Sequence, residues 1–313
     1  MPPRPMQPRQ PRTPTAAASA MRRRRVRAKF DAQVDREWAR YSGEAWRILV
    51  RELRDRFLAR QLPKGPGWVL ELGPGPGRFT PTVLASGARV AAVDLSLPML
   101  QALRRRKRVR GGFPRLRRVR AAGEHLPFRN GAFRAAVVYG NILGFSAAGG
   151  PQLLSEIARV VTPAGVLILD VSSPVAAVTE FLSAGARRRF LLRILRDPEY
   201  YLFNVHTKLR ARSHQPYAPK RLAFWEFDFY TVAGAESALA TAGFRPVDRM
   251  AVGAIGAFRD RLTTIARRER TTWKNLLELE ETIGRRPGVL ETGHGFVMAA
   301  VRSGRGRRTR SRA

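Results

Sequence analysis

The sequence contains no cysteine, which excludes disulfide scaffolds, cysteine-ligated zinc or iron–sulfur sites and cysteine nucleophiles. It also has no run of 18 consecutive apolar residues, so we expect no membrane span. Acidic residues are scarce, because only 24 stand against 58 lysines and arginines, and the formal net charge is +34. Hydrophobic residues still make up 44% of the 313 residues, which is enough to bury a sizeable core and excludes wholesale disorder.

The positive charge is concentrated in three segments without acidic residues. Residues 1–30 hold nine basic groups, residues 104–120 hold ten and residues 302–313 hold six. Arginine accounts for 52 of the 58 basic residues. Arginine favours bidentate phosphate contacts, but the coding bias of a GC-rich genome would give the same excess. Contact with RNA or the ribosome through the two tails and residues 104–120 therefore stands beside a solvated surface as an open alternative.

The composition along the chain predicts two tails around one catalytic domain. Residues 1–28 are rich in proline and arginine and predict a disordered basic tail, which we favour over an organellar transit peptide, so we expect a cytoplasmic location. Apolar residues at helical spacing over 29–65 predict N-terminal helices that would cover a cofactor or substrate. Residues 66–302 would form the catalytic domain, and residues 303–313 a second disordered basic tail.

Short apolar runs alternate with helical stretches in the catalytic domain, which predicts an α/β fold with a mostly parallel sheet and helices on both faces. Seven strands are expected, at Trp68–Leu72, Val90–Asp94, Leu116–Ala121, Ala135–Tyr139, Val166–Val171, Pro246–Val252 and Gly295–Val301. Two aromatic-rich runs, Tyr200–Leu209 and Arg221–Thr231, predict an added β-hairpin near 200–231. A helical insertion is expected near 255–292.

The first strand runs directly into a loop of three glycines, Gly73, Gly75 and Gly77, which lets the backbone turn sharply close to a ligand. In the dinucleotide-binding pattern the third glycine comes one residue later, and Pro74 and Pro76 have no N–H to offer a pyrophosphate. The loop therefore disfavours a nicotinamide-dependent dehydrogenase and suits a ligand without phosphate. Asp94 ends the second strand, where a carboxylate would accept hydrogen bonds from the hydroxyls of a ribose.

Four motifs in this order resemble the class I S-adenosylmethionine-dependent methyltransferases, and most of all the ubiquinone/menaquinone C-methyltransferase-like group. The resemblance covers about residues 66–173 and rests on Glu71-x-Gly73-x-Gly75-x-Gly77, Val93–Asp94–Leu95–Ser96–x–x–Met99, Glu124–His125–Leu126–Pro127–Phe128 and Leu154–x–Glu156–x–x–Arg159–Val160–x–x–Pro163–x–Gly165. It implies a Rossmann-like seven-stranded sheet and S-adenosyl-L-methionine as cofactor. The implied reaction is methyl transfer to an oxygen, nitrogen or carbon atom of a small molecule.

The resemblance also implies roles for individual residues. The implied cofactor-binding set, from the methionine moiety over the ribose to the adenine edge and the methyl group, is Glu71, Gly73, Gly75, Gly77, Asp94, Leu95, Met99, Ala122, Glu124, His125, Tyr139 and Asn141. Within this set the three glycines would line the methionine moiety and Asp94 would hold the ribose hydroxyls. Candidates for a catalytic residue are Asn141, Tyr139 and His206, and no metal is expected.

Two positions depart from the pattern of the family. Ala122 stands where an aspartate usually contacts the adenine amine, so this contact would fall to Glu124 or a backbone carbonyl. Arg134 follows Phe133 where the family has an aspartate. An RNA- or ribosome-associated methyltransferase, or a non-catalytic member of the fold that binds RNA, therefore stays open as the alternative function. Arginines among apolar residues within 181–195 would also suit an anionic membrane surface.

Overall fold

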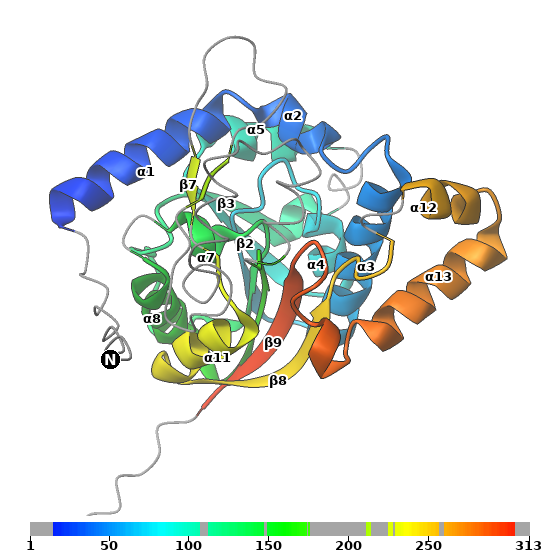
Figure 1. Ribbon diagram of the computed structural model, residues 1–313. Helices are drawn as coiled ribbons and strands as arrows, with labels where there is room; N and C mark the ends of the chain where they lie inside the picture. The colour runs from blue at the N-terminus through cyan, green and yellow to red at the C-terminus, as the bar shows by residue number, and fades with distance from the viewer. Residues whose placement is uncertain are drawn as a thin grey trace, which may run out of the picture.

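The computed structural model describes residues 15–106, 112–146, 149–173, 175, 211–213, 225–227, 229–256 and 260–303. Its centre is a seven-stranded sheet with the strand order β3-β2-β1-β4-β5-β9-β8 (Figure 1). The strands are β1 (Trp68–Leu72), β2 (Arg89–Asp94), β3 (Leu116–Arg120), β4 (Phe133–Val138), β5 (Val161–Val171), β8 (Phe244–Ala251) and β9 (Phe296–Arg302). Only β9 runs antiparallel to its neighbours within this sheet, so the predicted mostly parallel α/β sheet is confirmed.

Helices cover both faces of this sheet, and each strand-to-helix alternation expected from the sequence is present. In chain order they are α1 (Ala16–Asp31), α2 (Val34–Ala39), α3 (Ala45–Gln61), α4 (Thr80–Ala85), α5 (Leu97–Arg105), η1 (Phe113–Arg115), α7 (Ile142–Phe145), α8 (Gly150–Val160), α11 (Val232–Thr241), α12 (Asp260–Arg267), α13 (Arg270–Ile283) and η3 (Pro287–Val289). The pair α12 and α13 lies between β8 and β9, where the helical insertion was expected. Among the described residues no helix is long and apolar enough to cross a membrane.

The core forms two layers, one on each face of the sheet. The apolar stripe of α3 buries Leu49, Leu53 and Phe57 completely, in one layer with residues of α4 and α13. On the other face α8 and α11 pack their own apolar residues against alternate positions of the same strands. Each such large side chain contributes about 1.5–3 kcal/mol when it leaves water. The two layers therefore fix the central strands, and with them the loops at the carboxyl ends of these strands.

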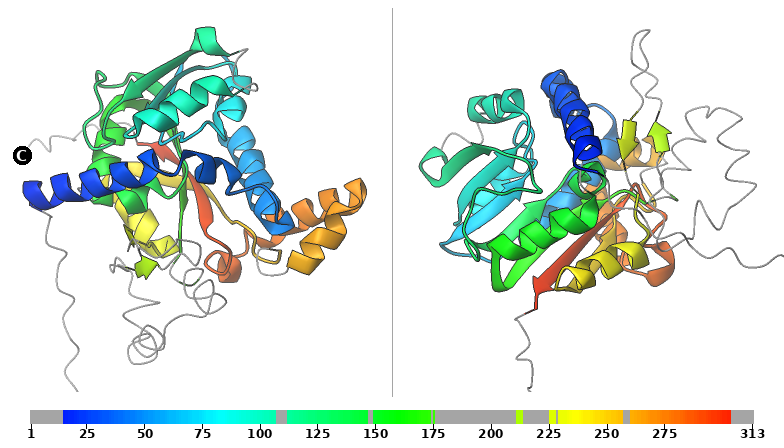
Figure 2. Two further views of the ribbon diagram at one scale, coloured as in Figure 1. Left: turned by 90° about the horizontal axis from the view of Figure 1, so that it is seen from above. Right: turned by 90° about the vertical axis from the view of Figure 1, so that its left-hand side faces the viewer.

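The N-terminal segment differs from the prediction of a disordered tail over 1–28. Residues 16–31 form α1, which begins after Thr15, whose hydroxyl accepts a hydrogen bond from the Ala18 amide at 3.2 Å. This stretch has no proline or glycine, and its first turns are rich in alanine, which has the highest helix propensity. Figures 1 and 2 show α1 and α2 running across one end of the molecule, above the sheet.

The predicted hairpin is described only in part. Strands β6 (Ala211–Ser213) and β7 (Trp225–Phe227) form an antiparallel two-stranded sheet. The strand β7 lies inside the second aromatic run, whereas the first run, residues 200–209, falls outside the described residues. The first strand of the described pair, β6, thus comes later in the chain than the first strand that the sequence predicted.

Candidate functional site

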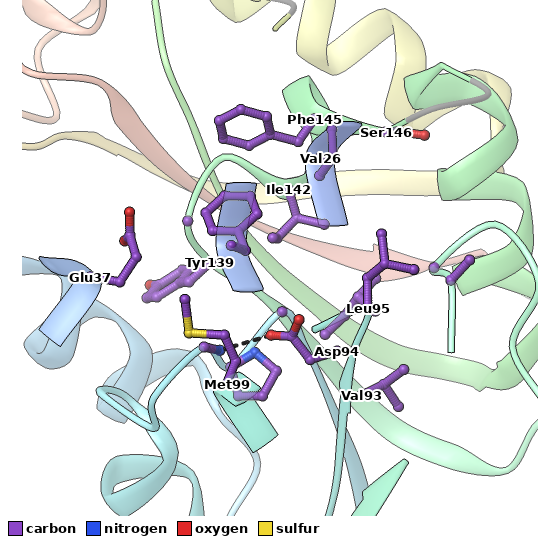
Figure 3. Close-up of a pocket in the computed structure, with 18 of the residues that line it drawn as sticks. Val26, Glu37, Val93, Asp94, Leu95, Met99, Tyr139, Ile142, Phe145 and Ser146 are labelled. Atoms are coloured by element: carbon purple, nitrogen blue, oxygen red, sulfur yellow. Dashed lines mark hydrogen bonds between the residues drawn. The ribbon is translucent and has the colours of Figure 1, made fainter. Parts of the chain in front are cut away.

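An open pocket lies at the carboxyl ends of β1, β2 and β4, and it encloses about 1090 Å³, part of which is open solvent. We call the loops that follow these strands the floor, meaning residues 73–76, 94–95 and 139–140. We call α1, α2 and the residues up to Tyr41 the roof. Arg23, Val26 and Phe30 of α1 line the pocket, and Figure 3 shows Val26 on the side away from Asp94. The pocket thus lies where the strand order reverses between β1 and β4, the usual ligand position in open α/β sheets.

The glycines of the loop after β1 have different tasks. A Cβ on Gly73 would stand 2.3 Å from Cδ1 of Ile142, and one on Gly77 would stand 2.2 Å from Cδ1 of Leu103. Both distances are shorter than any packing allows, so these two glycines let the loop fit under α7 and α5. At Gly75 the nearest atom would be the Met99 sulfur at 4.0 Å, in the pocket wall. The structure places Gly73 and Gly75 in the pocket lining but leaves Gly77 out of it.

The carboxylate of Asp94 joins two parts of the floor. Its Oδ2 accepts a hydrogen bond from the Gly75 amide at 3.1 Å (Figure 3), and its Oδ1 accepts one from the Ser96 amide at 2.8 Å. Burial raises the pKa of Asp94 to about 6, although the two amides act in the opposite direction. Asp94 lines the pocket at the tip of β2, so an acceptor of hydrogen bonds stands where the sequence expected it.

Glu71 lies behind the floor rather than in the pocket lining. The side chain is buried on β1, next to Thr80 at the start of α4. Burial raises the pKa of Glu71 to about 8, and the negative charge of Asp94 adds to this shift. The resemblance places Glu71 in the cofactor-binding set, but this position fits support of the glycine loop better than contact with a ligand.

The wall beyond the tip of β2 contains Leu95, Met99, Ala122 and Glu124, all of which line the pocket. Glu124 is buried and its Oε1 accepts a hydrogen bond from the Ser146 hydroxyl at 2.9 Å. His125, the next residue, is exposed and does not line the pocket. The structure thus brings together the expected adenine-side residues with the exception of His125.

The residues after β4 are held by a buried carboxylate. Oδ1 of Asp170, on β5, accepts hydrogen bonds from the Gly140 and Asn141 amides at 2.7 and 2.8 Å. Oδ2 of Asp170 forms an ion pair with Nε of Arg54 at 3.1 Å, and the two side chains are only 3% and 6% exposed. Arg54 also donates to the Tyr41 hydroxyl at 2.7 Å. This network therefore connects the floor to the roof through α3.

The candidate catalytic residues lie differently in the structure. The Tyr139 ring lines the pocket and meets Phe79 edge-on at 5.0 Å, while its hydroxyl donates to the Arg54 carbonyl at 3.3 Å. Burial raises the pKa of Tyr139 well above 10, so its phenol stays neutral. Asn141 has a left-handed backbone with φ 55°, and its side-chain oxygen accepts from the Ser172 amide at 3.3 Å instead of lining the pocket. His206 lies outside the described residues.

Sequence reasoning missed the Arg54–Asp170 pair and the part of the roof that α1 forms. An acid near the end of a parallel strand, as Asp170 is, was a usable signal, because ligands bind at the carboxyl ends of parallel strands.

Arg134, which stands where the family has an aspartate, has a structural role far from the pocket. Its guanidinium donates to the carbonyls of Pro63, Lys64 and Gly65, in the turn before β1. This residue therefore braces the opposite end of the sheet.

The chain is similar to known methyltransferases over about half of its length. Residues 69–165 match the family described as methyltransferase domain. The chain is 37% identical over 164 residues to malonyl-[acyl-carrier protein] O-methyltransferase of Halorhodospira halophila, covering 50% of this chain and 51% of that protein. It is 33% identical over 165 residues to demethylmenaquinone methyltransferase of Corynebacterium kroppenstedtii, covering 50% and 64%. The chain thus spans between about half and two thirds of these relatives.

A solved structure shows the same fold over nearly the whole chain. It is 1,6-didemethyltoxoflavin-N1-methyltransferase of Burkholderia thailandensis, with bound 1,6-didemethyltoxoflavin and S-adenosylhomocysteine. The TM-score is 0.52 at 19% identity, and the match covers 94% of each chain.

Proposed function

We propose that this chain, which carries a class I S-adenosylmethionine-dependent methyltransferase domain, binds that cofactor and methylates a small molecule. The observation that supports this most is the position of Asp94. Its carboxylate lines the pocket at the tip of β2, across from a glycine loop in which two prolines remove N–H donors. Such a site can hold a ribose and offers little to a phosphate.

The residues present fit the cofactor. Gly75 leaves open space beside Met99 where any larger residue would project into the pocket. Asp94 would accept from the ribose hydroxyls, and Leu95 and Met99 would contact the adenine. Ala122 stands where the family has an aspartate. Glu124 would make the adenine contact instead, because it lines the pocket and its carboxylate accepts a hydrogen bond from Ser146. When bound, the cofactor supplies an activated methyl group on a sulfonium.

The chain's own contribution to such a transfer is positioning and the exclusion of water. Tyr139 and Phe79 give the inner end of the pocket a rigid aromatic wall. Because its phenol stays neutral, Tyr139 would orient and desolvate rather than accept a proton. Val26 and Phe30 close the pocket from above, so that an acceptor would be enclosed between roof and floor.

Two observations favour a small acceptor over RNA. The two relatives that match half of the chain are named for a malonyl group on a carrier protein and for demethylmenaquinone, whereas a relative named for ribosomal RNA matches over only 51 residues. In the described part of residues 104–120, moreover, Arg115 and Arg118 donate part-buried hydrogen bonds to the backbone carbonyls of Leu84 and Leu100, which ties part of this segment to the domain. RNA or ribosome contact, a membrane surface and the cytoplasmic location stay predictions from the sequence.

Calorimetric titration of the full chain tests the proposal. We expect micromolar binding of S-adenosylhomocysteine and no binding of NADH. The Asp94→Asn variant, matched in size, should bind the first ligand more weakly. Binding of neither sulfur cofactor by the wild-type chain would overturn the proposal.

A second measurement separates the two acceptor classes. The chain is incubated with tritiated S-adenosylmethionine, total RNA and a bacterial small-molecule extract. We expect tritium to appear in the organic-extractable fraction below 3 kDa. Tritium in the precipitated RNA alone would favour the RNA-associated alternative.

A further inference from the structure

Cationic groups crowd around one side of the pocket. The guanidinium carbons of Arg78, Arg54 and Arg40 lie 4.5, 5.7 and 5.9 Å from the centre of the Tyr41 ring. Arg40, Tyr41 and Arg78 line the pocket, and Arg54 stands behind them on α3. Arg23 reaches the same pocket from α1. The segment after α2, the glycine loop and α3 thus bring three guanidinium groups together around the Tyr41 ring, and α1 adds Arg23 to the lining of the same pocket.

The acidic residues beside these arginines balance only part of their positive charge. Among the described residues, Asp170 pairs with Arg54 at 3.1 Å and Glu37 with Arg40 at 3.4 Å. Arg78 donates to the carbonyls of Glu37 and Trp38, the latter at 2.7 Å. Carbonyl oxygens carry no net charge, so these bonds orient Arg78 without neutralising it.

Neighbouring cations lower the pKa values of two groups here, in addition to the larger effect of burial. Burial lowers the pKa of Lys29 to about 8, and the charges of Arg40 and Arg36 lower it further against the opposing effect of Glu37. Burial also lowers the pKa of Arg78 to about 10, and Arg40 acts in the same direction. The bound cofactor would not relieve this field, because its sulfonium and ammonium outnumber its carboxylate. An anion placed here would be attracted by all these groups together.

Apolar surface lies directly beside these charges. The rings of Phe30 and Phe145 meet edge-on at 5.5 Å, and the Lys29 ammonium lies 4.8 Å from the Phe145 centre. Phe30, Phe145, Ile142 and Tyr139 all line the pocket (Figure 3). A ligand that fits both surfaces has an apolar body and a negatively charged end.

We propose, on the basis of the function inferred above, that the acceptor is a small apolar molecule bearing an oxyanion, and that Arg40 binds this oxyanion. Guanidinium groups suit carboxylates and phenolates, because their planar N–H donors can bind both oxygens of a carboxylate or donate two hydrogen bonds to a single phenolate oxygen. Arg78 faces the same region while it ties the glycine loop to α2. The positive field also favours the ionised form of the acceptor, so its ionisation needs no proton acceptor in the roof.

The test uses matched pairs of charged and neutral probes on the full chain saturated with S-adenosylhomocysteine. Benzoate is compared with benzamide, and hexanoate with hexanamide, by calorimetry at low salt. We expect at least one anion to bind at least tenfold more tightly than its amide. In Arg40→Gln this preference should fall about five- to tenfold, and Arg40→Lys should restore part of it. The control Arg89→Gln removes an exposed arginine at the start of β2, far from the pocket, and should change nothing.

Each alternative outcome has a distinct meaning. Equal binding of anions and amides, or no binding of either anion, would overturn the inference while leaving the proposed function intact. If Arg40→Gln weakens S-adenosylhomocysteine as much as it weakens benzoate, the arginines hold the carboxylate of the cofactor and the inference is also wrong. Failure of the wild-type chain to bind S-adenosylhomocysteine would instead overturn the proposed function itself.

Discussion

The floor and the roof of the pocket are held by opposite chemistries. In the floor, buried carboxylates accept from backbone amides: Asp94 from Gly75 and Ser96, and Asp170 from Gly140 and Asn141. In the roof, arginines donate to backbone carbonyls, as Arg22 of α1 does to Gly144 at 2.9 Å.

This difference separates two tasks. Bonds between buried carboxylates and amides are strong because they are charge-assisted and shielded from water. The contacts of the roof are partly exposed, so solvent and salt weaken them. We therefore expect the floor to keep its shape with or without ligand and to bind the cofactor. The roof, which carries the aromatic and cationic lining, is expected to select the acceptor.

The largest effect should come from the link between the two parts, the Arg54–Asp170 pair. Replacing Asp170 by asparagine leaves the Arg54 guanidinium buried without its counter-charge. We expect the free energy of unfolding to fall by about 3–5 kcal/mol, as when one partner of a buried ion pair is removed. Urea unfolding followed by circular dichroism measures this loss.

A matched control separates burial from charge. Glu278→Gln removes a carboxylate from the pair with Lys274, whose side chains are 51% and 70% exposed at a distance of 3.6 Å. This variant should lose no more than about 1 kcal/mol. Equal losses in both variants would mean that the buried pair does not hold floor and roof together.

Glu71, beneath the floor, should make stability depend on pH. Its pKa is raised from 4.5 to about 8, so the native state holds a proton that the unfolded state releases. The stabilisation is fully present below pH 4.5 and is lost as the pH rises through 8. Each unit of pKa shift is worth about 1.4 kcal/mol, so wild type should lose a few kcal/mol relative to Glu71→Gln between pH 5 and pH 9.

Unfolding of both proteins at several pH values measures this difference. Asp94, with a pKa of about 6, and Lys29, with a pKa of about 8, titrate in both proteins, so the difference between the two proteins reports Glu71. A constant difference between wild type and Glu71→Gln across this range would show that Glu71 titrates normally and that the floor does not rest on a neutral carboxyl.

The floor could be predicted from the sequence, whereas the part of the roof that α1 forms could not. Apolar runs gave the strands, and the glycines with Asp94 located the ligand edge, because these signals are local in the chain. Helix α1 has no apolar stripe, so its arginine-rich sequence predicted a disordered tail. Its position involves a contact of Arg22 with Gly144, which lies 122 residues away in the chain. The sequence also could not predict the orientation of Asn141, because its left-handed backbone conformation directs the side chain toward the Ser172 amide.

The next effect should concern affinity in the floor. Asp94→Asn keeps the size of the side chain but removes the charge that would accept from two ribose hydroxyls. We expect about 1.5–3 kcal/mol less binding of S-adenosylhomocysteine, the value of a charge-assisted hydrogen bond. Because the pKa of Asp94 is about 6, wild-type affinity should also weaken as the pH falls through 6, when the carboxylate takes up a proton.

Calorimetry at pH 5, 6, 7 and 8 checks both statements. The asparagine variant cannot titrate at this position, so its affinity should stay level between pH 5 and 7. A wild-type affinity that is independent of pH over this range would show that the Asp94 carboxylate does not contact the ligand.

The smallest effect is expected in the roof and tests whether its contacts serve binding rather than stability. Phe30→Ala removes the edge-on contact with Phe145 and part of the pocket lining, but Phe30 is only half-buried. Aromatic pairs of this kind contribute about 0.5–1.5 kcal/mol, so affinity for S-adenosylhomocysteine should fall about two- to tenfold with little change in melting temperature. Phe128→Ala is the matched control, since Phe128 meets Phe133 edge-on at 4.8 Å and does not line the pocket. It should lower the melting temperature and leave affinity unchanged. If Phe30→Ala instead destabilises the chain as strongly as Phe128→Ala, the roof is part of the folded core, and the division between a rigid floor and a selective roof fails.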